Sequence, residues 1–559
     1  MGFKLGLCFN NGIKYIFRFI WCTVCGVVFW RTYVHYRDGP QYIYLHEILG
    51  SWLCIARGSA AVININCAII LLPMCQCLLR LLYYCARKVN INTRRYTINT
   101  KVFHIFLGYI ILLAAAVHIT AHVFNAINFC EKYHSKYTNV NPFSKEKTTI
   151  FNIVFATIPG ITGILMVFIL LILFLTSLQF VRQRVFNVFW YSHRLFILLY
   201  VVMMIHGYKG PLRKQLNIEY HRPGCIQTTD NITDSQNSTI TGMVNNVTYI
   251  EPSVTSWNTT CIEAPKFGHI ECQTWLWLCV PVLLYCCDIL YRLVRRSTSL
   301  HISTAKSICK DIVEISLNVD NLQLTAGQYV FINCSTISLL EWHPFSVVQV
   351  PTKTNGHILK LWIKSAGDWT EQFTKKVMPQ DSILFNEENL PVSYPEVKVD
   401  GPYCSSMEHI SQYKVAVCIA GGVGITPFIS HLIYLEENNV NTEIQYIYLH
   451  CIVRDKTLLD NITSIVQHCS YKLGHSMRIK YDIYYTGDEK FYKHTTDVES
   501  FHTGRPSFNK IFKDIRQHQR KNTIGVFVCG PTSMCDTVRR ECHINTGFHT
   551  KFVFHKETF

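Results

Sequence analysis

Four histidines within apolar stretches are the residues of this sequence most suited to chemistry. His104 and His118 lie in one stretch, and His193 and His206 lie in another. Fourteen residues at 100° each bring the first two to within about 40° on one helix face, ~21 Å apart along the axis. Imidazoles that face each other across helices are natural axial ligands for b-type haem. We therefore expect two stacked haem sites, one made by His104 with His193 and one by His118 with His206.

A packing role is the alternative for each histidine, because a lone intramembrane histidine is often a hydrogen-bonded packing residue. Ionisable groups are costly in a bilayer, so four of them at matching depths favour ligation. The second pair sets a geometric condition, since thirteen residues place His193 and His206 about 140° apart on an ideal helix. The helix must overwind or bend between them for both rings to face inward.

Two further polar residues are predicted near the outer haem site. Arg57 lies a few residues into the second apolar stretch, and His122 follows His118 by one helical turn. The Arg57 guanidinium either neutralises a haem propionate alone or also stabilises a nascent oxygen anion. Both readings are open at this point.

The second half of the chain carries two motifs typical of flavin binding. His343-Pro344-Phe345-Ser346 lies at the end of a predicted barrel strand, where backbone groups and a hydroxyl would bind a flavin ring. Lys364 and Gly367-Asp368-Trp369-Thr370 follow at a distance suited to the flavin pyrophosphate. Each short match is weak alone, but their order along the chain makes the signal strong.

Motifs for a dinucleotide come next. Gly421-Gly422-Val423-Gly424-Ile425-Thr426-Pro427 follows a predicted strand, and Cys529-Gly530-Pro531 follows another. Glycines in a strand-to-helix turn let backbone N–H groups approach a pyrophosphate, so the dinucleotide is expected there. Arg454 and Arg505 would grip a ribose 2′-phosphate and select NADPH, or each is a solvated surface arginine.

These residues need membrane helices and soluble domains to position them. Hydrophobic residues make up 49% of the 559 residues and charged residues 16%, which disfavours both disorder and ordinary solubility. Nor does the chain show the basic, aromatic-interleaved face typical of nucleic-acid binding. Six stretches have the length of roughly 20 apolar residues that crosses a bilayer. They cover residues 13–34, 48–80, 102–128, 150–180, 190–209 and 273–293.

The orientation of these spans follows from their flanks. Lysines and arginines crowd the connections after the second, fourth and sixth stretches, which predicts that these connections are cytosolic. The third outer connection, residues 210–272, contains N-glycosylation sequons at Asn231, Asn237, Asn246 and Asn258. In this oxidising loop Cys225 and Cys261 are either a disulfide or two free thiols.

Three domains are predicted. Residues 1–296 form a six-span α-helical haem domain in the membrane. Residues 297–400 contain short β-branched runs, at 312–317, 328–332 and 357–363, which are typical of an antiparallel β-barrel that binds FAD. Residues 401–559 show buried strands, a glycine-rich turn and helices, which predict an α/β domain that binds NADPH.

In this order, the motifs resemble the NADPH oxidase family over essentially the whole chain, and its type-4 branch most. Tyr44-Leu45-His46 and Pro223-Gly224-Cys225 are part of that likeness. The resemblance implies a ferric-reductase-like domain with two haems, followed by FAD and NADPH domains like those of ferredoxin-NADP reductase. It implies electron transfer from NADPH to oxygen on the outer side, in the endoplasmic reticulum or plasma membrane. It also implies a small partner subunit, p22-phox, and hydrogen peroxide as the main product.

Two residue roles rest on this resemblance. His221 stands just before the Pro-Gly-Cys sequence, at the position of a histidine that promotes superoxide dismutation in the type-4 branch by supplying protons. Its alternative is a surface histidine in a long loop. The last residue, Phe559, would stack on the flavin until nicotinamide displaces it, and its alternative is a frayed terminus.

Two other functions fit parts of the sequence. A transmembrane ferric or cupric metalloreductase shares the architecture, but Arg57, His122 and a capped outer loop disfavour an open site for a metal chelate. A proton or ion channel would use the intramembrane histidines, yet it leaves the flavin and dinucleotide motifs without a role.

Overall fold

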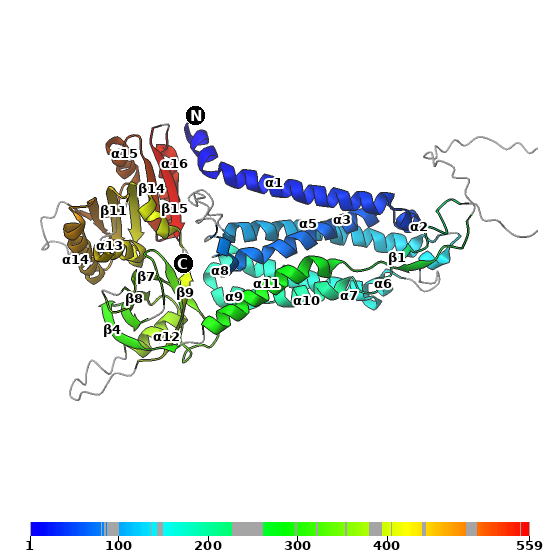
Figure 1. Ribbon diagram of the computed structural model, residues 1–559, viewed down its shortest axis with the longest axis horizontal. Coiled ribbons are helices and arrows are strands. Elements are labelled where there is room, and N and C mark those ends of the chain that lie inside the picture. The colour runs from blue at the N-terminus through cyan, green and yellow to red at the C-terminus, as the bar shows by residue number, and fades with distance from the viewer. Residues whose placement is uncertain are drawn as a thin grey trace, which may run out of the picture. The chain divides into compact units, whose positions relative to one another are not determined.

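Two compact units make up the chain, one of Phe17–Asp288 and the other of Met1–Ile16 with Ile289–Phe559. The first is mainly helical, and the second contains the two large β-sheets of the described residues (Figure 1). This computed structural model describes residues 2–75, 77–79, 81–82, 85, 100–134, 136–141, 149–225, 261–296, 299–319, 322–352, 355–378, 394–403, 405–438, 443–487, 500–547 and 549–557.

Long helices dominate the first half of the chain. They are α1 (Gly2–Asp38), α2 (Ile43–Leu49), α3 (Ser51–Ile70), α5 (Thr100–Glu131), α6 (Ile150–Ala156), α7 (Ile158–Ser177), α8 (Gln179–Arg184), α9 (Phe186–His193), α10 (Phe196–His206) and α11 (Thr274–Arg295). Short 3-10 turns add η1 (Pro40–Tyr42), η2 (Leu72–Met74) and η4 (Thr138–Val140).

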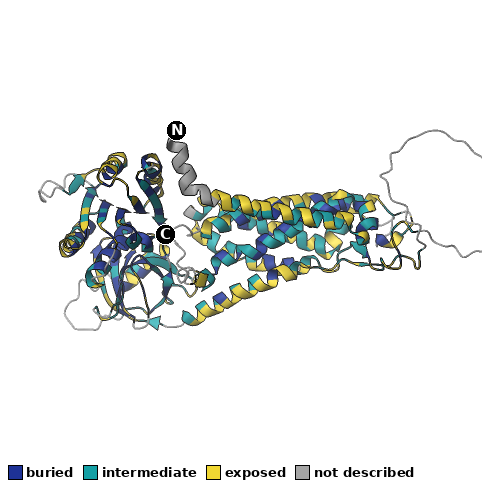
Figure 2. Ribbon diagram, turned by 45° about the horizontal axis from the view of Figure 1, so that its top comes forward, coloured by how far each residue is buried: buried dark blue, intermediate teal, exposed yellow. Residues whose placement is uncertain are grey.

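Five of the described helical stretches are long and apolar enough to cross a membrane. They are Ser51–Met74, Thr100–Glu131, Ile158–Ser177, Phe186–His206 and Thr274–Arg295. Large apolar side chains on them are exposed, such as Phe168 at 61% and Leu283 at 63%. Figure 2 shows exposed residues, in yellow, along these helices. Water would disfavour such a surface, whereas lipid matches it. The chain is therefore a membrane protein.

The predicted first span, residues 13–34, has no counterpart among these five stretches. It is helical as part of α1, but α1 is not among the five apolar stretches. Between Arg18 and Arg31 large apolar side chains such as Phe19 and Trp30 are exposed, so this span stays a prediction. Five of the six predicted spans therefore have counterparts among these helices.

The predicted span 150–180 is divided into two helices, α6 and α7. The Oγ1 atom of Thr157 accepts a hydrogen bond of 3.1 Å from the backbone N–H of Gly160 and so caps α7. Pro159, in the first turn of α7, has no N–H to donate. A polar cap and a proline thus begin a new helix inside one apolar run.

Short elements form a structure that we call the cap, comprising residues 40–49, 133–134, 136–141, 210–225 and 261–272. Its strands β1 (Arg213–Gln215) and β2 (Phe267–His269) pair antiparallel. The predicted disulfide between Cys225 and Cys261 is confirmed. The side-chain amide of Asn128 donates to the carbonyl of Leu49 at 3.2 Å, tying α2 to α5. The four sequons lie outside the described residues.

A curled antiparallel sheet follows, and its seven described strands have the order β3-β9-β6-β7-β8-β5-β4. The strands are β3 (Ser299–Leu300), β4 (Ile302–Cys309), β5 (Ile312–Asn318), β6 (Tyr329–Asn333), β7 (His343–Gln349), β8 (Ile358–Lys364) and β9 (Val397–Tyr403). Strands β5, β6 and β8 confirm the predicted runs. Helix α12 (Asp368–Val377) buries Trp369, Phe373 and Val377 in the same apolar core.

A buried ion cluster joins the end of α11 to this sheet. Arg295 and Arg296 both donate to the carboxylate of Asp400, which is 0% exposed. The hydroxyl of Tyr403 donates to the same carboxylate at 2.5 Å. Asp400 is thus compensated by charge and by hydrogen bonds, as a buried carboxylate must be.

The α/β part contains a parallel sheet whose six described strands have the order β13-β12-β11-β10-β14-β15. The strands are β10 (Val415–Gly421), β11 (Tyr446–Val453), β12 (Arg478–Tyr485), β13 (Phe501–Thr503), β14 (Thr523–Cys529) and β15 (Lys551–Glu557). The helical elements here are η6 (Ser406–Gln412), η7 (Gly422–Ile425), α13 (Thr426–Asn438), α14 (Lys456–Leu473), α15 (Phe508–His518) and α16 (Thr532–Asn545). Strand β10 is buried from Val415 to Ala420, as expected for a parallel strand covered on both faces.

Candidate cofactor sites

The histidines of α5 face those of α9 and α10 in the predicted pairs. The ring centres of His104 and His193 are 6.1 Å apart, and those of His118 and His206 are 6.4 Å apart. An iron ion between two imidazoles needs about 6 Å between ring centres, because each nitrogen binds the metal at ~2 Å and lies ~1 Å from its own ring centre. Both pairs therefore fit a bis-histidine haem.

The helix that carries His193 and His206 is interrupted between them, as the geometric condition required. Helix α9 ends at His193 and α10 begins at Phe196. At the junction Arg194 N–H donates to the carbonyl of Tyr191 and Leu195 N–H to that of Ser192, each three residues back. Such bonds wind the chain more tightly than an α-helix, which brings His206 round to the side of His193.

Neighbouring backbone holds the two rings of α5. His104 Nδ1 lies 3.0 Å from the carbonyl oxygen of Ile70, and His118 Nδ1 lies 2.9 Å from that of Ala56. A carbonyl can only accept, so Nδ1 is the donor in both bonds. The Nε2 lone pair of each ring is therefore available to a metal.

Hydroxyls of α7 hold the other two rings. His193 Nδ1 lies 3.3 Å from Ser177 Oγ, and His206 Nδ1 lies 2.9 Å from Thr162 Oγ1. Each hydroxyl donates its own hydrogen to a carbonyl one turn earlier in α7, so its oxygen accepts from Nδ1. A histidine that ligates a metal usually donates its other ring N–H in this way. Sequence reasoning missed these acceptors, whose one signal was a hydroxyl within an apolar run.

Arg57 and His122 lie beside the outer pair. The rings of His122 and His118 are 4.5 Å apart, and Arg57 follows Ala56, whose carbonyl binds His118. Arg57 Nε is buried and has no hydrogen-bond partner among the described residues, while its Cζ lies 5.4 Å from the ring centre of Tyr36. A buried guanidinium N–H without a partner fits an anionic group such as a propionate.

His221 lies in the interior of the cap, and not on the surface of a long loop. It is 1% exposed, and its Nε2 is 2.8 Å from the Tyr44 hydroxyl. Its ring lies close to the sulfurs of Cys225 and Cys261, but those sulfurs are bonded to each other and are not free to ligate a metal.

The structure brings the two flavin motifs together. The His343 ring stacks on Trp369 with ring centres 4.4 Å apart, and Phe345 lies 6.3 Å from Trp369. Trp369 Nε1 is buried without a partner in the described part of the chain, so a donor is available to a ligand. Burial lowers the pKa of His343, against the effect of Glu341 at 3.4 Å.

The remaining residues of these motifs surround that stack. Pro344 and Ser346 lie in β7, opposite Phe331 and Tyr329 of β6. Lys364 ends β8 and is exposed. Gly367 is the N-cap of α12, which begins at Asp368 and has Asp368 and Glu371 in its first turn. Thr370 Oγ1 accepts from the Gly367 N–H at 3.0 Å.

The glycine-rich turn packs directly on the Cys529-Gly530-Pro531 motif. A Cβ added to Gly424 would lie 2.4 Å from the Cys529 carbonyl oxygen, and one added to Gly421 would lie 2.9 Å from Pro531. Gly422 has a φ of +57°, a conformation that favours glycine. Thr426 and Pro427 then begin α13 and are both buried. Gly421 and Gly424 thus let the turn pack against the second motif, while the backbone at Gly422 has open space beside it.

Each of these segments follows a parallel strand and so lies at the carboxyl edge of the sheet. Arg454 follows β11, and Arg505 follows β13. Both arginines are exposed. The chain order reverses between β10 and β14, and ligands of open α/β sheets bind at such switch points. Phe559 lies outside the described residues.

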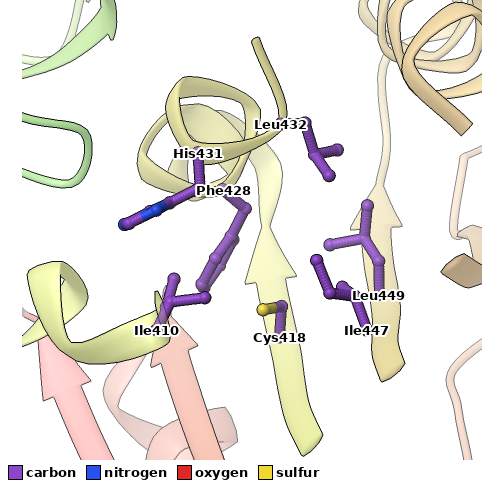
Figure 3. A pocket seen from close by; sticks show the side chains of 7 residues that line it. All are labelled: Ile410, Cys418, Phe428, His431, Leu432, Ile447 and Leu449. Carbon is purple, nitrogen blue, oxygen red and sulfur yellow. The ribbon is translucent and has the colours of Figure 1, made fainter. Parts of the chain in front are cut away.

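A small cavity beneath α13 is unsuited to a cofactor (Figure 3). Its volume is about 10 Å³, the space of one water molecule. His431 is at its edge, where it is 3.0 Å from the carbonyl of Met407, and burial lowers its pKa to about 4. The lining side chains are those of Ile410, Cys418, Phe428, His431, Leu432, Ile447 and Leu449.

Comparison with known proteins agrees with this arrangement. Three family models match: a ferric reductase like transmembrane component at residues 57–204, an FAD-binding domain at 297–407, and a ferric reductase NAD binding domain at 413–499 and 492–543. NADPH oxidase 4 of Homo sapiens is 33% identical over 574 residues, which cover 98% of each chain.

The chain belongs to the NADPH oxidase family. NADPH oxidase 3 of Homo sapiens is 28% identical over 98% of this chain and 99% of that one. A ferredoxin NADP+ reductase of Neisseria gonorrhoeae, solved with FAD and NADP, has a TM-score of 0.32 and 14% identity over 46% of this chain and 98% of that chain. This NADPH oxidase family member is an NADPH-driven transmembrane oxidoreductase with FAD-binding and NADPH-binding domains.

Proposed function

We propose that this family member passes electrons from cytosolic NADPH through FAD and two b-type haems to oxygen on the lumenal or extracellular side. Its products are superoxide and, mainly, hydrogen peroxide. The observation that carries this proposal is the arrangement of the two histidine pairs. Both have the spacing that an iron ion requires, and all four Nδ1 atoms are engaged so that Nε2 is available.

The protein groups at the haem sites have distinct roles. Bound haem supplies one-electron chemistry. His104 and His193 hold the inner group, and His118 and His206 hold the outer one. The carbonyl and hydroxyl acceptors on α3 and α7 fix the orientation of each ring. Arg57, whose Nε is buried without a described partner, neutralises negative charge beside the outer pair, and His122 lies next to it.

The soluble half binds the two-electron carriers. FAD bound here would supply both two-electron and one-electron chemistry. His343-Pro344-Phe345-Ser346 and Trp369 hold the flavin ring, while Lys364 and the N-terminus of α12 bind its pyrophosphate. The turn at 421–427 and the motif at 529–531 bind NADPH, and Phe559 covers the flavin in its absence.

The preference for NADPH over NADH is assigned to two arginines. Arg454 and Arg505 are exposed at the edge of the sheet where the dinucleotide binds, and a guanidinium binds a phosphate through paired hydrogen bonds.

The cap faces the lumen or the exterior of the cell in this proposal. Its disulfide indicates an oxidising compartment, which agrees with the sequons in the same loop. Family membership supports the endoplasmic reticulum or plasma membrane as the location, and a p22-phox-like small membrane subunit as the partner. His221 supplies protons for superoxide dismutation in the cap.

The test replaces one ligand at a time. We expect His118→Leu to abolish the outer-haem signal and oxygen reduction, while NADPH still reduces the flavin. His104→Leu should remove the inner-haem signal instead. His269→Leu is the control, because His269 is exposed in the cap and bonds the carbonyl of Gly210. Haem spectra and oxygen uptake are the measurements, and unchanged oxygen reduction in His118→Leu would refute the ligand assignment.

A further inference from the structure

Tyr44 and His221 form a buried pair in the cap, although they are 177 residues apart in the sequence. Tyr44 belongs to α2 and is 7% exposed, and His221 is 1% exposed. The phenol oxygen lies 2.8 Å from His221 Nε2. Burial shields this contact from water, which makes the bond specific and stronger than one at the surface.

The second ring nitrogen of His221 fixes the direction of this bond. His221 Nδ1 lies 3.0 Å from the carbonyl oxygen of Glu263, which can only accept, so Nδ1 carries the hydrogen. Nε2 of the neutral ring therefore has a lone pair and accepts from Tyr44. A further proton can add to the ring only at Nε2, and the described polar atom at that position is the Tyr44 oxygen.

The surroundings of the pair keep the phenol protonated. The Tyr44 ring contacts those of His134, Tyr137 and Phe267, with centres 5.2, 5.3 and 5.8 Å away. Burial raises the pKa of Tyr44 to about 12, and Tyr137 and Glu47 add to the effect. Tyr44 is thus a hydroxyl donor at neutral pH, not a phenolate.

The charged groups near the pair are engaged elsewhere. Glu47 binds His134 at 2.7 Å, and the Glu263 carboxylate binds Lys266 at 2.7 Å. Cys225 contacts His221 but is in the disulfide and does not titrate. Among the described residues, Tyr44 is therefore the side chain that exchanges a proton with His221 Nε2.

We propose that the Tyr44 hydroxyl is the group through which His221 gives up and regains the proton used in superoxide dismutation. Tyr44 thus transfers the proton and His221 resupplies it, and the proposal rests on the function proposed above. Protonated His221 gives its Nε2 proton to the phenol oxygen while the phenol gives its own proton to superoxide, and a proton from solvent then restores protonated His221. Two superoxide ions and two protons then give one hydrogen peroxide and one oxygen: one superoxide loses an electron and the other gains it.

The location of the pair indicates when it acts. Phe129 of α5 is in the same buried cluster as Tyr44, eleven residues after His118. Eleven helical residues span roughly 16 Å. The pair is therefore not at the outer histidines, and it acts on superoxide that has left the site of oxygen reduction.

Tyr44→Phe tests the proposal, because it keeps the aromatic packing and removes only the hydroxyl. Tyr137→Phe is the matched control, since the Tyr137 ring lies in the same cluster and its hydroxyl has no hydrogen bond within the described part of the chain. His221→Gln and the double variant complete the set. Full-length protein in membranes is supplied with NADPH, and oxygen uptake, superoxide and hydrogen peroxide are measured between pH 6 and 8.

We expect Tyr44→Phe and His221→Gln each to raise the ratio of superoxide to peroxide by roughly tenfold, below the full range of general acid catalysis. Oxygen uptake and the haem spectrum should not change. The double variant should show the same product ratio as each single variant, since both substitutions interrupt the same proton-transfer route. Tyr137→Phe should behave as the unchanged protein.

The other outcomes separate the two proposals. If the ratio of superoxide to peroxide rises in His221→Gln but not in Tyr44→Phe, the role of Tyr44 is overturned and the proposed function remains intact. No shift in either variant, with normal oxygen uptake, overturns both proton roles. No oxygen reduction by the unchanged protein overturns the proposed function itself. If Tyr44→Phe does not fold, difluorotyrosine at position 44 keeps the hydroxyl with a lower phenol pKa, and an unchanged pH profile of the product ratio would overturn the proposal.

Discussion

Thr162→Val and Ser177→Ala should each impair one haem and spare the other. Thr162 accepts from His206 in the outer pair, and Ser177 accepts from His193 in the inner pair. The other two Nδ1 atoms bond backbone carbonyls, which no substitution removes. Substituting these hydroxyls therefore perturbs each haem site separately and leaves all four histidine ligands in place.

The size of each effect follows from the length of the bond that is lost. Loss of a partner that orients a metal-binding histidine costs about 10- to 100-fold in affinity, which is about 1.4 to 2.8 kcal/mol. The Thr162 bond is 2.9 Å long, near the usual length, and the Ser177 bond is 3.3 Å long, slightly beyond the usual range. Thr162→Val should thus have the larger effect, near the upper end of that range.

The assay is the haem content per chain with a redox titration of the purified protein. Thr120→Val is the control, because Thr120 is exposed on α5 and bonds the carbonyl of Ala116. We expect outer-haem loss in Thr162→Val, a smaller inner-haem loss in Ser177→Ala, and no loss in the control. Equal effects on both haems, or none, would refute the reasoning that these hydroxyls orient particular rings.

Other substitutions test the soluble half. Asp400→Asn should lower the free energy of unfolding by about 3–5 kcal/mol, because it leaves two arginines without their buried counter-charge. The control, Asp536→Asn, breaks an exposed ion pair with Arg539 of 3.8 Å and should lower it by less than about 1 kcal/mol. Thermal unfolding of the two variants measures the difference. Gly424→Ala forces a Cβ to 2.4 Å from the Cys529 carbonyl and should raise the KM for NADPH by up to about 100-fold with haem content unchanged. Burial lowers the pKa of His431 to about 4, while the unfolded chain binds the proton near pH 6.5. The free energy of unfolding should therefore fall by up to about 3 kcal/mol between pH ~6.5 and ~4. In His431→Gln the contribution of this histidine to that fall should be absent when unfolding is measured against pH.

Local pattern in the sequence determined the elements and the order of the sites. Apolar runs predicted five of the helices that can span a membrane, and the spacing of His104 and His118 placed them on one helix face. Strand runs and the glycine-rich turn predicted the two soluble folds, because burial on one or both faces leaves a periodic trace in the chain. Even the disulfide was foreseen as one of two states of Cys225 and Cys261.

Tertiary structure decided which distant groups meet. The sequence could state that His193 and His206 needed an irregular helix, but the turn at residues 194–195 appears only in the folded chain. The Nδ1 acceptors come from other helices, and His221 is buried by Tyr44 from a segment 177 residues away. Contacts of this kind depend on how helices pack and where loops return, and neither is encoded in the periodicity of a single segment.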